Sequence, residues 1–437
     1  MSYYVFIDNF RGFTDTCFPI TDVNFFVGEN STGKSSVLGL LKLFSGPRFF
    51  MGQDFADEDV SFSHFLDMVS AHSTDQSYFS VGFASETKNK QGEVSSATGC
   101  LFTFRERQGQ PRLFKCTFCR NQEEITLKFG SAIYCKTTHC DTTPNAQSVI
   151  AALRSKWVEE HGSKDNGYKK LDSPANLGGR VPLLLALSLA RETAKSKDKR
   201  DTFLVYPPEI GFAPPELTWF GPIRTQPKRT YDELSIDFSP EGQHTPYLIR
   251  RMLRSKSHAT KLKNFLESVG KASGLFQDVK ITSFGRGVTA RFELDVVLDG
   301  KALNILNVGY GVSQSLPIIV ELLARPPRTW FAIQEPEIHL HPRAQAALGD
   351  VLFEMSTIDH KRFLVETHSD YTIDRFRMKY REGRSSRPDS QILFFERRDK
   401  HNVVTSLPIA NTGELPADQP DNYRKFFVHE QMNLLGL

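Results

Sequence analysis

The chain has 437 residues, of which 39% are hydrophobic and 24% are charged, with a formal net charge of +3. This length allows one large or two ordinary domains, and so small a charge does not by itself indicate a nucleic-acid partner. The longest apolar runs are about half of the roughly 20 residues that a bilayer span needs, and no signal peptide opens the chain. Six cysteines are too few for a disulfide framework. We therefore expect a globular cytoplasmic protein with no membrane partner.

The first 45 residues predict a strand pair and a helix. Apolar stretches at Tyr3–Ile7 and Val23–Val27 are typical of strands. The crowded leucines of Ser35–Phe44 predict a buried helix that ends before Pro47. A glycine-bearing segment separates the second strand from this helix.

That segment matches the pattern G-x-x-x-x-G-K-[ST] without exception, and it reads Gly28-Glu29-Asn30-Ser31-Thr32-Gly33-Lys34-Ser35. In such a phosphate-binding loop the backbone N–H groups surround the phosphates at a helix N-terminus. We expect Lys34 to reach the outer phosphates and the Ser35 hydroxyl to ligate Mg²⁺. A chance glycine turn is the alternative, and the flanking strand and helix argue against it.

The middle of the chain has a different sequence pattern. Short alternating segments between residues 75 and 145, such as Leu101–Arg105 and Leu113–Cys119, predict a β-rich region. Residues 146–200 have a helical pattern, and the proline-rich stretch 206–215 marks a boundary. We therefore divide the chain into 1–74, 75–214 and 215–437.

The last third predicts alternating strands and helices. A basic helix is expected at Arg250–Val269, followed by paired strands within Val279–Leu298. Further strands are expected at Trp330–Ile333 and Arg362–Val365, with helices at Ala344–Met355 and Ile373–Tyr380. This alternation predicts an α/β fold with a mostly parallel sheet flanked by helices.

Polar residues follow both of those later strands. Glu335 comes directly after the apolar strand at 330–333 and Gln334, so it is our candidate for polarising an attacking water. An exposed Glu-Pro-Glu turn is the alternative. His368 follows the next strand and is a candidate contact to the γ-phosphate, although a lone histidine is more often structural.

A third candidate is the small-residue loop Asn307–Gln314, which opens an expected helix at Ser315–Leu323. Such a helix start can bind an anion.

Together these motifs resemble ABC-type ATPases. The segments that carry the resemblance are Asn9–Gly12, the phosphate loop, Gly309–Gln314, Gln334–Pro342 and Glu366–Ser369. They are most similar to the ATPase module of the overcoming-lysogenization-defect (OLD) family, whose relatives include the SMC and RecF proteins. The motifs occur in family order within residues 1–70 and 215–437. The resemblance implies an ABC-type ATPase head that carries a β-rich and helical insertion at 75–214.

The resemblance also implies roles for single residues. Glu335 would be the catalytic glutamate, His368 the switch histidine, and Arg11 would lie near the nucleotide. The segment Gly309–Gln314 would act as a signature loop that closes in trans over ATP held by a second copy, giving a head-to-tail homodimer or a larger oligomer. The expected nucleotide-binding residues are Arg11, Gly28, Glu29, Asn30, Ser31, Thr32, Gly33, Lys34, Ser35, Ser36, Gly309, Gly311, Ser313 and Gln314. Lys34 joins Glu335 and His368 as a catalytic residue.

The chain departs from the family pattern at Gln334, because the family has an acidic residue there that supports Mg²⁺. A neutral amide oxygen can still ligate a metal or hold a metal-bound water, but we expect slow hydrolysis, as suits a switch. Gln53 is a weaker candidate for the glutamine that contacts Mg²⁺. The expected metal residues are therefore Ser35, Gln334 and Gln53.

Other patterns have ordinary alternatives. Cys116, Cys119, Cys135 and Cys140 are numerous enough for a zinc site, but we prefer buried hydrophobic cysteines. The segment Trp219–Tyr231 interleaves basic and aromatic residues, and we interpret it first as scaffold near the dimer interface. Basic helical stretches near 250–263 and 375–384 make DNA a further candidate partner, with a solvated helix face as the preferred interpretation.

OLD nucleases continue into a Toprim domain, and this chain ends at Leu437 before such a domain. We therefore expect a regulatory ATPase that controls a separate nuclease or toxin, as in the anti-phage systems PARIS and Septu. The alternative is a RecF- or SMC-like ATPase that binds DNA in repair or maintenance. A third interpretation is an ATP-gated scaffold without hydrolysis, which rests on Gln334.

Overall fold

The computed structural model describes residues 2–52, 54–57, 59–89, 91, 93–120, 123–139, 146, 149–151, 167–171, 183, 215–232, 237–285, 287, 290–382 and 386–423. The chain divides into two compact units. The first comprises Met1–Thr21, Glu29–Leu217 and Phe394–Ser406, and the second comprises Asp22–Gly28, Thr218–Leu393 and Leu407–Leu437. Among the described residues, no helix is long and apolar enough to cross a membrane.

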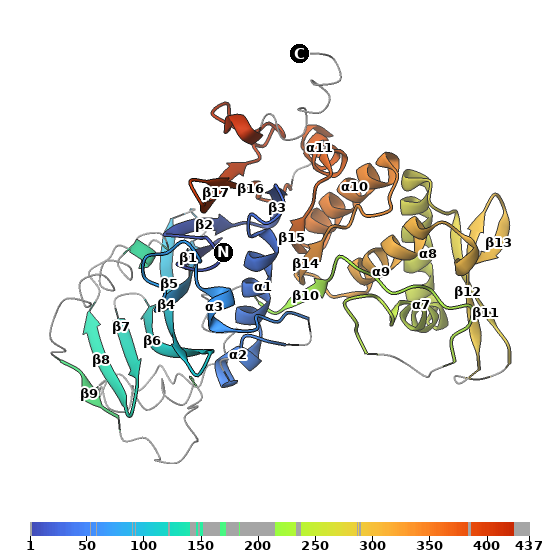
Figure 1. Ribbon diagram of the computed structural model, residues 1–437. Helices are drawn as coiled ribbons and strands as arrows, with labels where there is room; N and C mark the ends of the chain where they lie inside the picture. The colour runs from blue at the N-terminus through green and yellow to red at the C-terminus, as the bar shows by residue number, and fades with distance from the viewer. Residues whose placement is uncertain are drawn as a thin grey trace. The chain divides into compact units, whose positions relative to one another are not determined.

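A six-stranded sheet contains the strands that precede the phosphate loop, Glu335 and His368 (Figure 1), and its strand order is β10-β14-β15-β3-β16-β17. The strands are β10 (Leu217–Phe220), β14 (Trp330–Gln334), β15 (Arg362–Glu366), β3 (Val23–Gly28), β16 (Ser390–Arg398) and β17 (His401–Pro408). Strands β14, β15 and β3 are parallel, with Gln334 opposite Glu366 and Glu366 opposite Phe26. Because parallel neighbours end at the same edge of a sheet, the carboxyl ends of these three strands lie together.

These parallel strands are apolar because they are buried. Every residue of β3 and β14 is buried, as expected for strands covered on both faces. Helices α10 (Pro342–Ile358) and α11 (Asp370–Met378) pack against each other. The ring of Phe376 in α11 lies 5.1 Å from that of Phe25 in β3 and 5.4 Å from that of Phe353 in α10. The predicted parallel sheet with flanking helices is confirmed.

Between β10 and β14, the described residues form helices and a small antiparallel sheet, in which β12 pairs with β11 and with β13. These elements are α7 (Thr245–Arg254), α8 (Lys256–Ser273), β11 (Asp278–Ser283), β12 (Phe292–Leu298), β13 (Lys301–Asn304), the 3₁₀ turn η1 (Ile305–Asn307) and α9 (Tyr310–Ala324). The paired strands predicted within Val279–Leu298 are confirmed.

Two helices of this region differ from the prediction. The single basic helix expected at Arg250–Val269 is wrong, because Ser255 is extended (φ −96°, ψ 123°) and separates α7 from α8. The Ser255 hydroxyl lies 2.9 Å from His258 Nδ1, a local side-chain bond of the kind that competes with helix continuation. The helix expected to begin at Ser315 begins at Tyr310, with Gly309 as its N-cap.

The first unit contains an eight-stranded sheet with the order β2-β1-β4-β5-β6-β7-β8-β9. Its strands are β1 (Ser2–Asp8), β2 (Thr16–Ile20), β4 (Tyr78–Lys88), β5 (Val94–Arg107), β6 (Gln110–Arg120), β7 (Glu123–Phe129), β8 (Ile133–His139) and β9 (Lys169–Lys170). Neighbouring strands pair antiparallel throughout. The predicted β-rich segment is therefore present, and its strands extend the sheet that β1 and β2 begin.

One face of this sheet packs through phenylalanine rings. Phe102 and Phe104 of β5 meet Phe44 of α1 (Lys34–Ser45) at centroid distances of 5.5 and 6.5 Å. The ring centroid of Phe49, in the short helix α2 (Pro47–Gly52), lies 4.0 Å from that of Phe44. These mostly tilted and edge-on pairs add attraction beyond simple burial, and they fix the helix that follows the phosphate loop against the sheet.

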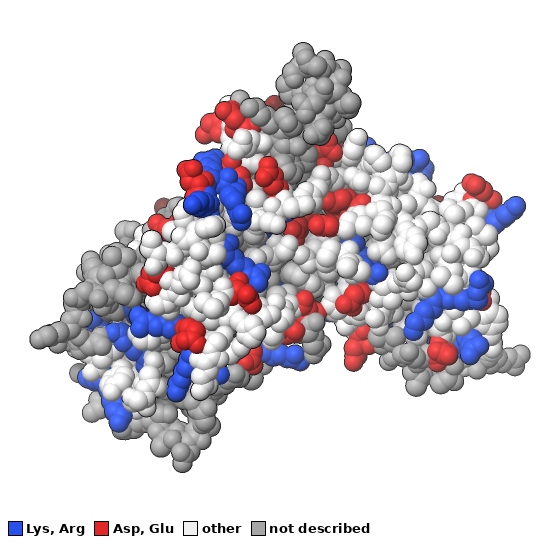
Figure 2. Space-filling view, in the orientation of Figure 1, with Lys and Arg blue, Asp and Glu red and all other residues white. Residues whose placement is uncertain are grey.

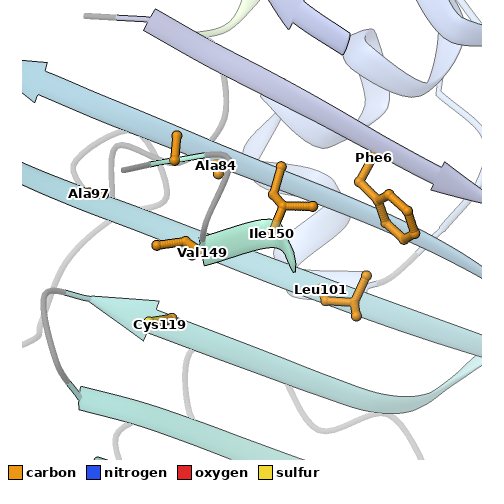
Figure 3. Close-up of a cluster of buried hydrophobic side chains, with 8 residues drawn as sticks. Phe6, Ala84, Ala97, Leu101, Cys119, Val149 and Ile150 are labelled. Atoms are coloured by element: carbon orange, nitrogen blue, oxygen red, sulfur yellow. The ribbon is translucent and has the colours of Figure 1, made fainter. Parts of the chain in front are cut away.

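The opposite face buries a smaller cluster (Figure 3), made of Phe6, Ala84, Ala97, Leu101, Cys119, Ala146, Val149 and Ile150. Within the segment predicted to be helical, residues 146, 149–151 and 183 are helical. Residues 167–171 are also described and include the extended pair β9, whereas the rest of 146–200 and most of the proline-rich boundary lie outside the described residues.

Candidate active site

Residues 28–36 have the backbone of a phosphate-binding loop. The loop follows β3 directly and runs into α1, whose N-cap Gly33 has φ 95°. This left-handed conformation favours glycine, and a Cβ at Gly33 would lie 2.5 Å from the ring of Phe13. Among the described residues, no side chain caps the N-terminus of α1. Its first N–H groups therefore point to a site for an anion.

The side chains of the loop support the same role. Lys34 is buried, and its Nζ donates to the carbonyl oxygen of Glu29 at 2.8 Å. The Thr32 hydroxyl donates to the same carbonyl oxygen, also at 2.8 Å. Asn30 and Ser35 are exposed. The lysine thus lies along the loop while the Ser35 side chain is accessible to a ligand.

Arg11, which the resemblance places near the nucleotide, lies next to this loop. Its Nη1 donates to the Ser36 hydroxyl at 3.2 Å, and its guanidinium lies 4.6 Å from the centre of the Phe62 ring. Burial lowers the pKa of Arg11, and Asp67 partly offsets that effect. Arg11 has φ 44°, a left-handed conformation that costs a non-glycine residue about 1 kcal/mol.

Two residues beyond the predicted set hold Arg11 and the loop. Asn402 Nδ2 donates to the Arg11 carbonyl oxygen at 2.9 Å, and Arg397 Nη2 donates to the Ser31 carbonyl oxygen at 3.1 Å. They come from the end of β16 and the start of β17, more than 360 residues away in sequence. No local pattern in the sequence marks either residue.

The predicted signature loop is helical. Gly309 is the N-cap of α9, and Gly309 and Tyr310 are exposed. Ser313 and Gln314 are buried in the first turns, and the Ser313 hydroxyl donates to the Tyr310 carbonyl oxygen at 2.9 Å. A Cβ at Gly311 would lie 2.9 Å from the His339 carbonyl oxygen. The exposed helix start at Gly309 and Tyr310 is therefore what this segment presents to a ligand.

The ends of β14 and β15 are joined through their side chains. Gln334 Nε2 donates to Glu366 Oε2 at 2.9 Å, and both residues are buried. Glu337 accepts from the backbone N–H of His368 at 2.5 Å and from the Thr367 hydroxyl at 2.8 Å. Burial raises the pKa of Glu337, and these hydrogen bonds partly offset that effect. Glu337 thus fixes the backbone that carries the exposed His368.

Glu335 stands on a sharp turn just beyond the sheet edge. Its φ is 44°, its N–H donates to the Glu366 carbonyl oxygen at 2.8 Å, and it is partly exposed. The structure therefore brings Gln334, Glu335 and the backbone of His368 together at the carboxyl edge of β14 and β15, as the sequence predicts.

Arg224 is a further charged residue at this edge. It is only 4% exposed, and its Nη2 donates to the Gln334 carbonyl oxygen at 3.0 Å. Its Nε and Nη1 are buried without a hydrogen-bond partner among the residues that the structure describes. Burial lowers the pKa of Arg224 to about 10, although Glu337 and Glu335 act in the opposite direction. The basic and aromatic pattern of Trp219–Tyr231 predicted a scaffold segment and did not indicate that Arg224 lies beside the carboxylates.

The predicted metal residues have different outcomes. Ser35 is exposed beside the phosphate loop, Gln334 uses its amide nitrogen to bind Glu366, and Gln53 lies outside the described residues. Within the described ranges, no group of three or more His, Cys, Asp and Glu residues forms a metal cluster.

The zinc alternative conflicts with the pairing of the sheet. Cys116 and Cys135 both lie opposite Leu127, whereas Cys119, three residues along β6, faces the cluster of Figure 3. Side chains an odd number of residues apart on a strand point to opposite faces. Cys116 and Cys119 therefore cannot share one metal ion, and Cys140 lies outside the described residues.

Two family models match the chain. The model described as an AAA ATPase domain matches residues 4–140, and the model described as an AAA domain, putative AbiEii toxin, Type IV TA system, matches residues 157–374. A search of curated proteins gave no match. Together with the phosphate loop between β3 and α1, these matches show a P-loop ATPase fold.

Several solved structures are similar to the chain at low identity. One is an SMC head domain from Thermotoga maritima, with 11% identity, a TM-score of 0.40, and coverage of 92% of this chain and 98% of that chain. Another is an Smc head domain with an extended coiled coil bound to the C-terminal domain of ScpA, derived from Pyrococcus furiosus, with 11% identity, a TM-score of 0.43, and coverage of 100% and 99%. A third, an SmcHead bound to the C-winged helix domain of ScpA, has 13% identity, a TM-score of 0.45, and coverage of 93% and 98%.

Proposed function

We propose that this protein binds ATP and hydrolyses it slowly as a regulatory ATPase. The observation that carries the proposal is the phosphate loop, because its left-handed Gly33 precedes a helix start that no described side chain caps. This arrangement suits the phosphates of a nucleotide, since both the N–H groups and the helix dipole favour an anion there.

The loop residues and the strand ends divide the chemistry between them. Lys34 would neutralise the outer phosphates, and the Ser35 hydroxyl would be a ligand for Mg²⁺, an ion that would supply further neutralisation of phosphate charge. Glu335 orients the attacking water, and His368 contacts the γ-phosphate. Glu337 supports this role by binding the His368 N–H.

We further propose that the active form is a head-to-tail dimer. The start of α9 supports this proposal, because Gly309 and Tyr310 are exposed at a helix N-terminus without a described side-chain cap. Such a helix start can close over the phosphates of ATP bound to another copy. Each site would then be complete only when two copies meet.

The biological role that we propose is control of a separate toxin or nuclease in anti-phage defence. The resemblance to OLD-type ATPases and the family description that names a putative AbiEii toxin support this proposal. The region 75–214 is our candidate for binding the effector or a trigger.

The test is phosphate release from the purified protein with Mg-ATP, with Lys34→Ala and Glu335→Gln as controls. We expect turnover that both substitutions abolish, and an ATP-bound dimer that accumulates in Glu335→Gln. ATP binding without turnover in the wild-type protein would instead support an ATP-gated scaffold. Absence of ATP binding would refute the proposal.

DNA binding is the second candidate function. Figure 2 shows lysine and arginine side chains over the part of the second unit that contains α7, and Arg251, Arg254 and Lys256 are exposed there. A DNA-binding ATPase would show salt-sensitive binding and turnover that duplex DNA stimulates. Turnover that DNA leaves unchanged would favour the regulatory ATPase.

A further inference from the structure

The edge formed by β14 and β15 contains three carboxylates that differ in what they can bind. Both oxygens of Glu337 already accept hydrogen bonds, from His368 N and the Thr367 hydroxyl, and burial raises the pKa of this carboxyl. Glu335 lies on the turn beyond the edge and is partly exposed. Glu366 is 4% exposed and accepts from the uncharged Gln334 amide. Glu366 is therefore the most buried of the three carboxylates, and it is the last residue of β15, the strand next to β3.

The sheet order gives Glu366 a favourable position. Strand β15 lies between β14 and β3, and Glu366 is opposite Phe26, two residues before the phosphate loop begins at Gly28. The N–H of the next residue, Thr367, donates to the Phe26 carbonyl oxygen at 3.2 Å. Residue 334 is one strand farther from β3, a spacing of about 4.8 Å. A carboxylate at 366 thus lies nearer to the strand that carries the phosphate loop than one at 334.

Arg224 provides an independent sign of a ligand at this edge. Its Nε and Nη1 are buried without a partner in the part of the chain that the structure describes, next to the carbonyl of Gln334. Buried charged donors are costly when they remain unpaired. Phosphate oxygens or a metal-bound water are partners that these donors can use.

We propose that Glu366 is the carboxylate that supports the Mg²⁺ of the bound nucleotide in this protein, with the Gln334 amide holding it in position. The inference rests on the proposed ATP binding. Mg²⁺ prefers oxygen ligands and keeps several of its waters, so Glu366 acts on the ion directly or through one of these waters. Glu366 thereby supplies the negative charge that Gln334 lacks.

The test exchanges the two side chains. Glu366→Gln removes the carboxylate, Gln334→Glu adds one, and the double variant Gln334→Glu/Glu366→Gln moves the charge across the same hydrogen bond with no change of size. Glu267→Gln, on the exposed face of α8, is the control for loss of one negative charge. Binding of a fluorescent ATP analogue is measured with and without Mg²⁺, and Mn²⁺ affinity of the nucleotide complex is measured by electron paramagnetic resonance.

We expect Glu366→Gln to weaken Mn²⁺ binding by about 10- to 100-fold, the range found when groups that support a metal are removed. The double variant should recover most of this loss, and Glu267→Gln should match the wild type. If Glu366→Gln fails to fold, Glu366→Asp and the double variant test the proposal instead. Both keep one carboxylate and should retain metal binding.

The outcomes separate the two proposals. Unchanged Mn²⁺ binding in a folded Glu366→Gln variant that still binds ATP would overturn the role of Glu366 and leave ATP binding intact. Loss of metal binding that the double variant does not recover, with ATP binding retained, would reduce Glu366 to a structural partner of Gln334. Failure of the wild-type protein to bind ATP would overturn both proposals.

Discussion

Replacing Arg224 by methionine tests whether the buried guanidinium binds a ligand but destabilises the ligand-free folded protein. Arg224→Met keeps an unbranched side chain but removes the charge and all the N–H donors. Arg224 makes one hydrogen bond to Gln334 and leaves Nε and Nη1 unpaired among the described residues. We therefore expect the nucleotide-free variant to be at least as stable as the wild-type protein.

The magnitude follows from the pKa. Burial lowers the pKa of Arg224 to about 10, even with the opposing attraction of Glu337 and Glu335, and this shift corresponds to about 3 kcal/mol against the charged form. At neutral pH arginine is charged in both the folded and the unfolded chain, so this destabilisation is fully present. Loss of the bond to Gln334 costs about 1 kcal/mol, and the smaller side chain about 1 kcal/mol more. The net expectation is a gain of about 1 kcal/mol.

The assay is urea denaturation of the nucleotide-free protein, with Arg229→Met as the control because Arg229 is exposed. We expect the midpoint of Arg224→Met to rise without a change in slope, and that of Arg229→Met to stay unchanged. A second measurement adds Mg-ATP, which stabilises a protein that binds it, and this stabilisation should be smaller in Arg224→Met. A loss of more than about 1 kcal/mol in nucleotide-free Arg224→Met, with Arg229→Met unaffected, would show that the guanidinium is a structural requirement.

Three other changes test the site. Burial raises the pKa of Glu337, so the wild-type protein loses stability as pH rises from about 4 through that raised pKa. Glu337→Gln lacks this loss, so its melting temperature relative to that of the wild type should increase over the same pH interval. A difference in melting temperature that stays constant with pH would contradict this prediction. Gly33→Ala should abolish ATP binding in a calorimetric titration, because a Cβ at residue 33 would lie 2.5 Å from the Phe13 ring. The control is Gly109→Ala, where φ is 74° and no atom lies within 4 Å of the new Cβ. This control carries the same backbone strain of about 1–2 kcal/mol and should bind ATP normally. Asn402→Asp removes the donor to the Arg11 carbonyl and should lower the free energy of unfolding by about 1–3 kcal/mol, with the exposed Asn411→Asp unchanged.

The order of strand, phosphate loop and helix could be predicted because its signals are local. The apolar run of β3, the left-handed position at Gly33 and the leucines of α1 are adjacent in sequence. The carboxyl ends of β14 and β15 were predictable for a similar reason, since each buried strand is followed directly by its polar residues. Parallel pairing then brought Gln334 and Glu366 into register without any further information.

The parts that sequence analysis missed depend on distant partners. Asn402 and Arg397 act on the segment around Arg11 and Ser31 from the other end of the chain. The break at Ser255 and the early start of α9 depend on backbone conformations at single residues, whereas helical periodicity averages over several residues. Such features follow from tertiary structure and leave no periodic signal.

Gln334 and Glu366 form a side-chain pair that position 334 alone does not reveal. Taken alone, a glutamine at the end of β14 suggests weak metal binding. The structure couples it to Glu366 through an amide–carboxylate hydrogen bond of 2.9 Å between buried side chains. This pair has one negative charge and one neutral amide, so exchanging the two residues conserves both the charge and the hydrogen bond. If Glu366 supports Mg²⁺ as we propose, the capacity of this edge to bind a cation depends on the pair, and position 334 alone does not determine it.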